Sequence, residues 1–316
     1  MRTVFMGTPE FSATVLQTLC ENGIRPDAVV TRADKPAGRG YTLMQSAVKK
    51  YALSQEIEVL QPEKLSDPVF FERLKELDPE LIIVVAYGRI LPESVLNMPK
   101  YGCINAHASL LPKYRGAAPM QRAIMDGEKE TGVTIQRMDN GIDTGDIILT
   151  ITTPITEEDN LETVHDRLAL LSGEALLEAV KQLQDGTATF TKQDGEKANY
   201  AEKIGKTDEI IDFTQTAEQL SCRIRALSPF PYAFFSYNGK RIKITSAHTV
   251  PDMSSEGKQA GEVISVKGGE IKVACGQGVL AITGVFPESK RRMGASDFVN
   301  GSKIKPGDIF EKYSEQ

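Results

Sequence analysis

The chain has 316 residues, of which 41% are hydrophobic and 25% are charged, and its formal net charge is −6. These values are typical of a globular protein and exclude wholesale disorder, and the length predicts two domains. No apolar run reaches the roughly 18 residues of a membrane-spanning helix, and the first residues lack the apolar region of a signal peptide. The four cysteines form no C-x-x-C pair, which indicates neither a zinc site nor a disulfide scaffold, and we expect a cytoplasmic protein.

Charge is distributed unevenly along the chain. Residues 1–202 contain 21 Lys and Arg against 30 Asp and Glu, whereas residues 203–316 contain 16 against 13. The acidic part argues against a chain that coats nucleic acid without specificity. The net charge of +3 on the C-terminal part is compatible with a polyanionic partner, although such a small net charge more often belongs to an ordinary solvated surface.

Short apolar runs alternate with helical stretches over the first two thirds of the chain. Strands are expected at residues 2–6, 27–31, 81–86, 101–105, 132–137 and 147–152, and helices at 8–20, 46–55, 68–77 and 161–183. The run Leu81–Ala86 is rich in β-branched residues, which is typical of a parallel strand buried on both faces. The alternation predicts an α/β fold with an open, mostly parallel sheet.

The pattern changes after Gln184, where a polar stretch without a clear period indicates a linker. A helix is expected at residues 214–227, followed by five short strands at 233–237, 241–247, 261–266, 270–274 and 279–283. The pairs Asn238-Gly239 and Gly268-Gly269 are typical of hairpin turns, and the strands together predict a small β-barrel. We therefore expect a first domain at residues 1–188, a linker at 189–207 and a second domain at 208–316.

The densest group of functional side chains begins at Asn105 and continues through His107 and Ser109 to Pro112. It follows a predicted buried strand, and ligands of open α/β sheets bind outside the carboxyl ends of the strands. A lone histidine is more often a structural residue. However, residues i and i+2 of a strand point the same way, so Asn105 and His107 are expected to converge. An amide and an imidazole that point at one place can stabilise an oxyanion.

A second polar group runs from Asp139 to Asp146 and contains three carboxylates and two glycines. A capped polar loop would explain this composition, and so would a calcium loop, although the spacing of an EF-hand is absent. If Asp143 lies near His107, it can orient the imidazole ring and raise its basicity. Sequence spacing alone does not decide whether the two residues meet.

Three weaker patterns remain. Gly7-Thr8-Pro9 follows the first predicted strand, but it is not the G-x-G-x-x-G of a dinucleotide site. The segment Lys35–Gly40 is a basic, glycine-rich loop without the G-K-[ST] of a P-loop; it is either a mobile surface loop or an arm that places Lys35 and Arg39 against phosphate. The cluster Lys290–Arg292 is most often a solvated turn.

Taken together, these residues resemble the folate-dependent formyltransferases. The pattern Asn105-x-His107, the segment Ser109–Pro112 and Asp143 within Gly141–Gly145 match the signature of that family. The segments 6–11, 35–40, 111–119, 130–135 and 200–204 and the added β-rich domain are similar to the branch of the family that acts on methionyl-tRNA. The resemblance therefore covers essentially the whole chain.

The resemblance implies a Rossmann-like formyltransferase domain and a C-terminal OB-like barrel that binds tRNA. It implies 10-formyltetrahydrofolate as co-substrate, no metal, initiator Met-tRNA as partner, no membrane contact and a monomer. The implied catalytic residues are Asn105, His107 and Asp143. The implied folate-binding residues are Val85, Tyr87, Gly88, Ser109, Leu110, Leu111, Pro112 and Asp139, and the implied tRNA-binding residues are Lys35, Arg39, Lys203 and Lys206.

One segment departs from the family pattern, because Pro229-Phe230-Pro231-Tyr232 stands where an aromatic residue, Pro and then Gly are expected. Three rival functions share features of the chain. They are a formyltransferase that acts on a small amine such as an amino-sugar nucleotide, a hydrolase that releases formate from the folate, and a non-enzymatic RNA-binding module. The Lys35–Gly40 loop with the basic C-terminal part argues against the first, and the complete set of Asn105, His107 and Asp143 argues against the last.

Overall fold

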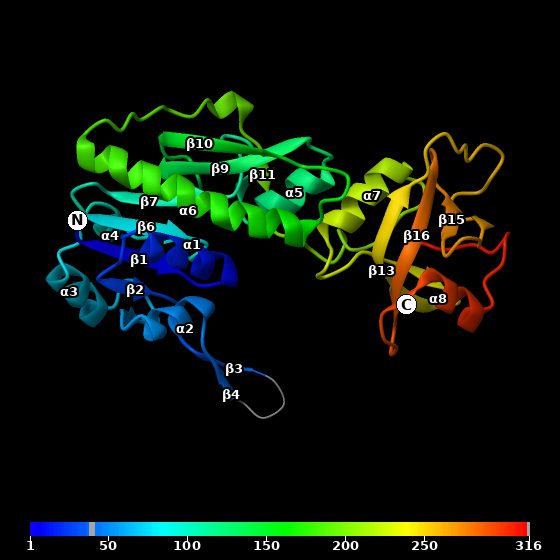
Figure 1. Cartoon of the computed structure of the whole chain (residues 1–316), viewed down its shortest axis with the longest axis horizontal. Coiled ribbons are helices and arrows are strands. Elements are labelled where there is room, and N and C mark those ends of the chain that lie inside the picture. The colour runs from blue at the N-terminus through cyan, green and yellow to red at the C-terminus, as the bar shows by residue number, and fades with distance from the viewer. Residues whose placement is uncertain (38–41, 315–316) are drawn as a thin grey trace. The chain divides into compact units, whose positions relative to one another are not determined.

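The structure, a computed structural model, describes residues 1–37 and 42–314 and divides the chain into two compact units (Figure 1). The first unit contains residues 1–119, 130–154 and 165–201, and the second contains residues 120–129, 155–164 and 202–316. Among the described residues, no helix is both long and apolar enough to span a membrane.

The first unit is built on a seven-stranded sheet with the strand order β10-β9-β7-β6-β1-β2-β5. The five neighbouring strands β7, β6, β1, β2 and β5 are parallel to one another. Beyond β7, β9 pairs antiparallel with β7, and the edge strand β10 pairs antiparallel with β9. The predicted α/β class with a mostly parallel sheet is confirmed. The strands are β1 (Thr3–Gly7), β2 (Ala28–Val30), β5 (Glu58–Leu60), β6 (Leu81–Val85), β7 (Cys103–His107), β9 (Glu130–Arg137) and β10 (Ile147–Pro154).

Helices cover both faces of this sheet. On one face α1 (Glu10–Glu21) and α6 (Leu161–Asp185) pack side by side. Their contact is close, since a Cβ on Gly173 of α6 would lie 2.6 Å from the Thr18 side chain of α1. On the other face Val4 of β1 and Ile82 of β6 pack in one apolar cluster with residues of α3 (Pro68–Glu76) and α4 (Glu93–Leu96). All residues of β1 and β6 are buried, as expected for strands covered on both faces.

Several elements of the first unit are shorter or different from the prediction. The strand expected at residues 101–105 is β7 at Cys103–His107, because Gly102 adopts the left-handed conformation (φ 77°) just before it. Short elements that the sequence pattern did not reveal are β3 (Lys35–Ala37), β4 (Thr42–Met44), β8 (Arg115–Gly116), η1 (Gly195–Lys197) and β11 (Tyr200–Ala201). The remaining helix of this unit, α2 (Ala47–Ser54), begins after Ser46, whose side chain accepts a hydrogen bond from the Lys49 amide.

The second unit contains an antiparallel sheet with the order β12-β13-β16-β15-β14, and β17 pairs with β16. At the β12–β13 turn, Asn238 and Gly239 both have positive φ (52° and 70°), as the predicted hairpin requires. The strands are β12 (Phe234–Tyr237), β13 (Lys240–Thr249), β14 (Val263–Ser265), β15 (Ile271–Ala274), β16 (Val279–Pro287) and β17 (Met293–Gly294), and the helices are α5 (Pro119–Met125), α7 (Ala217–Ala226) and α8 (Ala295–Ser302).

The segment 309–311 closes this sheet into a barrel. Glu311 bridges Ser236 of β12 at one edge, and Ile309 bridges Glu262, just before β14, at the other. Between them Phe310 is buried and stacks on Phe235 at a ring-centroid distance of 4.4 Å. The expected OB-like barrel is therefore confirmed, with a last segment that the sequence pattern did not reveal.

Candidate active site

Strand β7 carries Asn105 and His107 on one face of the sheet. The two residues are separated by one position, so their side chains point the same way. The imidazole of His107 is only 7% exposed, and Asn105 is half-buried. The structure therefore brings these two residues together, as the sequence predicted.

The loop between β9 and β10 carries Asp143 to the same place. Asp143 Oδ1 lies 3.4 Å from Asn105 Nδ2 and 3.5 Å from His107 Nδ1, and Asp143 Oδ2 accepts a hydrogen bond of 2.9 Å from the Gly116 amide. Asp143 has a left-handed backbone conformation with φ 54°, which is uncommon for residues other than glycine, although aspartate tolerates it better than most. Such strain persists only where the surroundings hold it, and it is frequent at functional sites.

Both ring nitrogens of His107 face oxygen acceptors. Nε2 lies 2.9 Å from the carbonyl oxygen of Tyr114, and Nδ1 faces the Asp143 carboxylate. A neutral imidazole has one N–H and can satisfy only one of these acceptors as a donor, whereas an imidazolium can satisfy both. The two acceptors therefore hold the imidazole ring in its observed orientation.

The site also contains polar residues that the sequence analysis did not single out. Gln136 of β9 is 1% exposed, and its Nε2 donates to Asp143 Oδ1 at 2.9 Å. Gln193 Nε2 donates to the backbone carbonyls of Asp143 (2.9 Å) and Gly145 (2.8 Å), while its Oε1 accepts from Arg115 at 2.8 Å. The sequence does not single out Gln136, because β9 also contains the buried polar residues Thr131 and Thr134. Nothing local in the sequence signals Gln193, because it lies in the polar stretch that predicts a linker.

The segment after β7 is fixed by a short chain of hydrogen bonds. The Leu111 amide donates to Thr134 Oγ1 (3.1 Å), which itself donates to the Ser109 carbonyl (2.7 Å). The Ser109 side chain donates to the Lys113 carbonyl, and the Leu111–Pro112 peptide is cis. The Leu110 side chain covers Gly132, where a Cβ would lie 2.6 Å from Leu110 Cδ2. This segment is therefore held close to His107.

The crevice of the sheet lies between β1 and β6, where the strand order changes direction. A Cβ on Gly7 would lie 2.9 Å from the Val85 carbonyl, so only glycine lets the two strand ends approach this closely. Thr8 Oγ1 is buried here without a hydrogen-bond partner among the described residues. An unpaired buried hydroxyl fits a site that a polar ligand completes.

The residues after β6 have different surroundings. Val85 is fully buried, Gly88 is exposed with φ 76°, and Ala86 also has positive φ. Tyr87 packs into the apolar cluster beneath α3, and burial raises the pKa of its phenol, against the opposing charge of Arg89. The Tyr87 side chain thus belongs to the core, and its backbone remains the part available to a ligand.

Asp139 lies at the start of the Asp143 loop and is exposed. Its Oδ1 accepts hydrogen bonds from the Gly141 amide (3.0 Å) and from Thr144 Oγ1 (2.6 Å). In the described structure it caps its own loop and is not drawn into the cluster of Asn105, His107 and Asp143. No group of three or more His, Cys, Asp or Glu suited to a metal ion occurs among the described residues.

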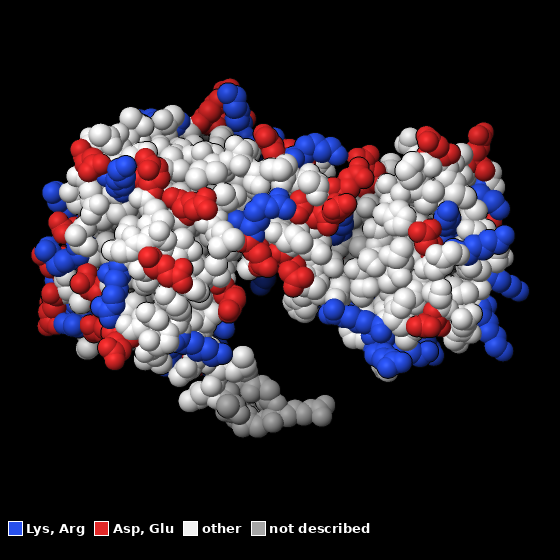
Figure 2. Space-filling view, viewed as in Figure 1, with Lys and Arg blue, Asp and Glu red and all other residues white. Residues whose placement is uncertain are grey.

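The lysines expected to bind tRNA lie apart from this cluster in the sequence. Lys35 begins β3 and is exposed, and Arg39 lies outside the described residues. Lys203 and Lys206 are exposed in the second unit. Figure 2 shows basic and acidic side chains interspersed over the drawn face, without one continuous basic surface.

Comparison with known proteins places this geometry in a family. Residues 1–180 match the model of the formyl transferases, and residues 203–303 match that of the formyl transferase C-terminal domain. The chain is 46% identical to the methionyl-tRNA formyltransferase of Caldanaerobacter subterraneus subsp. tengcongensis (98% of this chain and 100% of the relative) and 43% identical to that of Citrifermentans bemidjiense (99% and 97%). A solved N-formyltransferase from Helicobacter canadensis, in complex with folinic acid and dTDP-3-aminofucose, has the same fold with a TM-score of 0.66, 20% identity and coverage of 89% and 98%. The chain therefore belongs to the formyl transferase family.

Proposed function

We propose that this protein transfers a formyl group from 10-formyltetrahydrofolate to the α-amino group of methionine esterified to initiator tRNA. The observation that carries the proposal is the meeting of the Asp143 carboxylate with Asn105 and His107. Relatives that match nearly the whole chain, at 46% and 43% identity, are methionyl-tRNA formyltransferases. We place the activity in the cytoplasm, in a monomer.

The three residues divide the chemistry between them. Asn105 Nδ2 and the Nδ1–H of His107, whose Nε2 is already paired with the Tyr114 carbonyl, donate hydrogen bonds to the formyl oxygen, on which negative charge develops when the amine attacks the formyl carbon. Loss of one such donor typically costs about 10²–10³ in rate. Asp143 orients the imidazole and assists removal of a proton from the attacking amine, directly or through water. The C–N bond to the folate then breaks, and the folate nitrogen takes up a proton.

The folate is proposed to lie between the ends of β1, β6 and β7. Val85, the backbone of Tyr87 and Gly88 lie at one side, and the segment Ser109–Pro112 and Asp139 lie at the other. The unpaired Thr8 hydroxyl and the close approach of Gly7 to Val85 fit a polar ligand in this crevice.

The tRNA is proposed to contact Lys35 and Arg39, and also Lys203 and Lys206 of the second unit. These side chains act as cations against phosphate, and such contacts weaken steeply as salt rises. We further propose that residues 1–188 perform the chemistry, that 189–207 connect the domains, and that 208–316 supply an auxiliary tRNA contact.

The test is formyl transfer from 10-formyltetrahydrofolate to methionine charged on initiator tRNA, with elongator Met-tRNA and free methionine as parallel acceptors. We expect transfer to the initiator alone, with a rate that falls steeply as ionic strength rises. Transfer to none of them, with folate still bound, would reject the tRNA assignment in favour of a small amine. Release of formate without any acceptor would indicate a hydrolase.

The catalytic assignment is tested separately with Asn105→Ala, His107→Ala and Asp143→Ala. Each is expected to lower kcat by two orders of magnitude or more while circular dichroism and thermal unfolding remain those of a folded protein. Near-normal turnover of His107→Ala would overturn the assignment. Arg39→Ala should instead raise KM for the tRNA and leave folate binding unchanged.

A further inference from the structure

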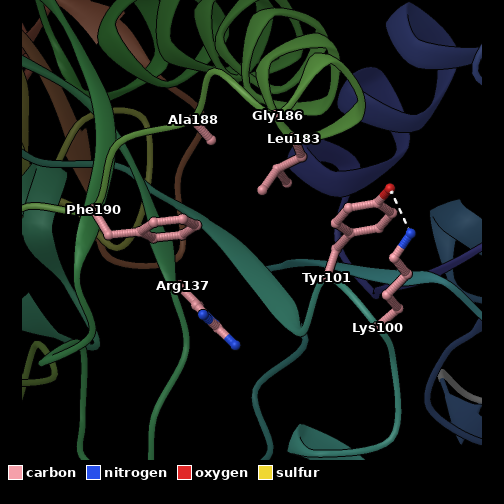
Figure 3. A pocket seen from close by; sticks show the side chains of 7 residues that line it. All are labelled: Lys100, Tyr101, Arg137, Leu183, Gly186, Ala188 and Phe190. Carbon is pink, nitrogen blue, oxygen red and sulfur yellow. Dashed lines mark hydrogen bonds between the residues drawn. The ribbon is translucent and has the colours of Figure 1, made fainter.

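A cavity of about 240 Å³ opens in the first unit at the amino end of β7 (Figure 3). Tyr101 and Lys100, just before β7, form one wall, and Arg137 at the end of β9 and Phe190 after α6 form the other. Tyr101 precedes His107 by six positions, which corresponds to about 20 Å of extended chain. The cavity is therefore separate from the cluster of Asn105, His107 and Asp143.

This cavity is lined by positive charge, whereas residues 1–202, the part of the chain that contains it, are acidic overall. Its charged lining residues are Lys100 and Arg137, and no carboxylate lines it. Neither cation forms an ion pair within 4.0 Å with any residue that the structure describes. Because residues 1–202 carry 30 acidic against 21 basic side chains, two cations on opposite walls of one hollow, without a salt bridge to a described carboxylate, favour an anionic ligand.

Both cations lie against aromatic rings. The Arg137 guanidinium lies 5.5 Å from the centroid of the Phe190 ring, and Lys100 Nζ lies 4.7 Å from that of Tyr101. Figure 3 shows the two rings on opposite sides of the hollow, with Leu183 between them on the helix side. Phe190 is 41% exposed, so a large apolar ring borders the cavity without being covered.

A hollow with two aromatic rings and two cations has the composition of a site for single nucleotides. Bases stack on aromatic side chains regardless of sequence, and Arg or Lys holds the phosphate. The volume lies below the roughly 300 to 1,000 Å³ of sites for drug-sized ligands, which limits the occupant to a ligand about the size of one nucleotide. Inorganic phosphate would leave the rings uncovered, and an uncharged heterocycle would leave the cations unpaired.

We propose that this cavity binds one nucleotide, with its base against Phe190 and Tyr101 and its phosphate at Arg137 and Lys100. The nucleotide is either free in solution or an unstacked residue of an RNA, since the recognising chemistry is the same. The site is independent of the proposed formyl transfer, because none of its residues contacts the Asn105–His107–Asp143 cluster through its side chain in the described structure.

The test is a titration of the full-length protein with AMP, in which ligand-observed NMR measures the binding of AMP. AMP is expected to bind with a Kd on the order of 0.1–1 mM, and adenosine and inorganic phosphate each at least tenfold more weakly. Phe190→Ala should weaken AMP binding about tenfold or more through loss of stacking. Arg137→Gln should weaken AMP but not adenosine.

Two substitutions serve as matched controls. Lys50→Gln removes an exposed positive charge from α2, and Leu53→Ala removes an exposed apolar side chain from the same helix. Neither should change AMP binding, and all four variants should keep the thermal stability of the parent. The proposal is overturned if AMP does not bind, if phosphate alone binds as tightly as AMP, or if Phe190→Ala and Arg137→Gln bind AMP like the parent protein.

The two sources of the nucleotide are separated by competition with tRNA. If an RNA residue occupies the cavity, AMP should compete with tRNA, and Phe190→Ala should weaken tRNA binding by a similar factor. If a free nucleotide occupies it, AMP should bind without changing the affinity for tRNA. Since AMP titration needs no folate and no formyl transfer, failure of this site and failure of the proposed activity give different results.

Discussion

Gln136 Nε2 lies 2.9 Å from Asp143 Oδ1, closer than the nearest nitrogen of either Asn105 or His107. The residue that fixes the carboxylate most directly is therefore not one of the three to which the chemistry is assigned. Gln136 is buried and is the last residue but one of β9, seven positions before Asp143. The position of Asp143 thus depends on β9 as much as on its own loop.

The first prediction concerns this hydrogen bond. Gln136→Ala removes a donor to a charged group, and such bonds contribute about 1.5–3 kcal/mol. We expect kcat of formyl transfer to fall about 10- to 100-fold with little change in KM for the folate. Gln17→Ala is the control, because Gln17 donates to Glu21 on an exposed helix surface and its loss should leave kcat unchanged. A normal kcat in Gln136→Ala would show that Asp143 needs no support from β9.

The second prediction concerns the loop backbone. Gln193 ties the carbonyls of Asp143 and Gly145 to Arg115, so Gln193→Ala should release the loop from its left-handed conformation. Hydrogen exchange of residues 139–146 should accelerate, and kcat should fall about tenfold or more. Gln193→Asn should show most of the same loss of activity, since its shorter side chain does not reach both carbonyls. Unchanged exchange in Gln193→Ala would contradict this account.

The third prediction compares two glycines. A Cβ at Gly7 would lie 2.7 Å from Ser12 Cβ and 2.9 Å from the Val85 carbonyl, whereas a Cβ at Gly195 meets nothing within 4 Å. Overpacking of this kind costs about 1–3 kcal/mol, so Gly7→Ala should lower Tm by several degrees. Gly195→Ala should leave Tm essentially unchanged. Calorimetry of both variants measures the difference, and equal Tm values would rule out the close approach of β1 and β6.

The fourth prediction concerns pH. Hydrogen bonds from Lys312 and Thr214 hold the pKa of Asp212 at about 2, below its ordinary value of 3.8. A carboxyl whose pKa is lower in the folded than in the unfolded state stabilises the fold above the unfolded pKa and loses that effect as pH falls towards 2. The Tm difference between the parent and Asp212→Asn should therefore be largest above pH 5 and shrink between pH 4 and 2. Because the pair is partly exposed, the effect should be small and should weaken with salt.

The fifth prediction concerns thiol reactivity. Burial raises the pKa of Cys103 to about 12 and that of Cys275 to about 11. Since only the thiolate reacts, both cysteines should resist iodoacetamide in the folded protein at pH 8 and react fully in guanidinium. Mass spectrometry of the labelled peptides distinguishes the sites. Rapid labelling of Cys103 in the native protein would show that the region between β7 and α4 opens.

Most of the fold could be predicted from the sequence because the central strands β1 and β6 are apolar throughout and buried on both faces, while β13 of the second unit alternates between buried and exposed residues. Leu81–Ala86 was expected as a strand and is β6 at Leu81–Val85, and the hairpin at Asn238-Gly239 has the two positive φ values that its residues suggested. The short pairs β3–β4 and β8–β11 were missed, because two or three residues give no period. Closure of the barrel by residues 309–311 was missed because it depends on partners about 50 and 75 positions away.

The candidate site was predictable to the same degree. Asn105 and His107 could be paired by their spacing in a strand, but the approach of Asp143 depends on a loop with positive φ and required the structure. Gln193 could not be foreseen, because a polar residue in a polar stretch carries no signal of its own. Tyr87 was expected to line the folate pocket, and the structure places its side chain in the core beneath α3.

The closing segment of the barrel has a consequence for synthesis of the chain. Strands β12 to β16 precede residues 309–311 in the chain, so both edges of the sheet and the face of Phe235 stay uncovered until those last residues dock. Open sheet edges pair readily with other chains. Until Phe310 docks, the newly made second unit therefore exposes edges that favour aggregation.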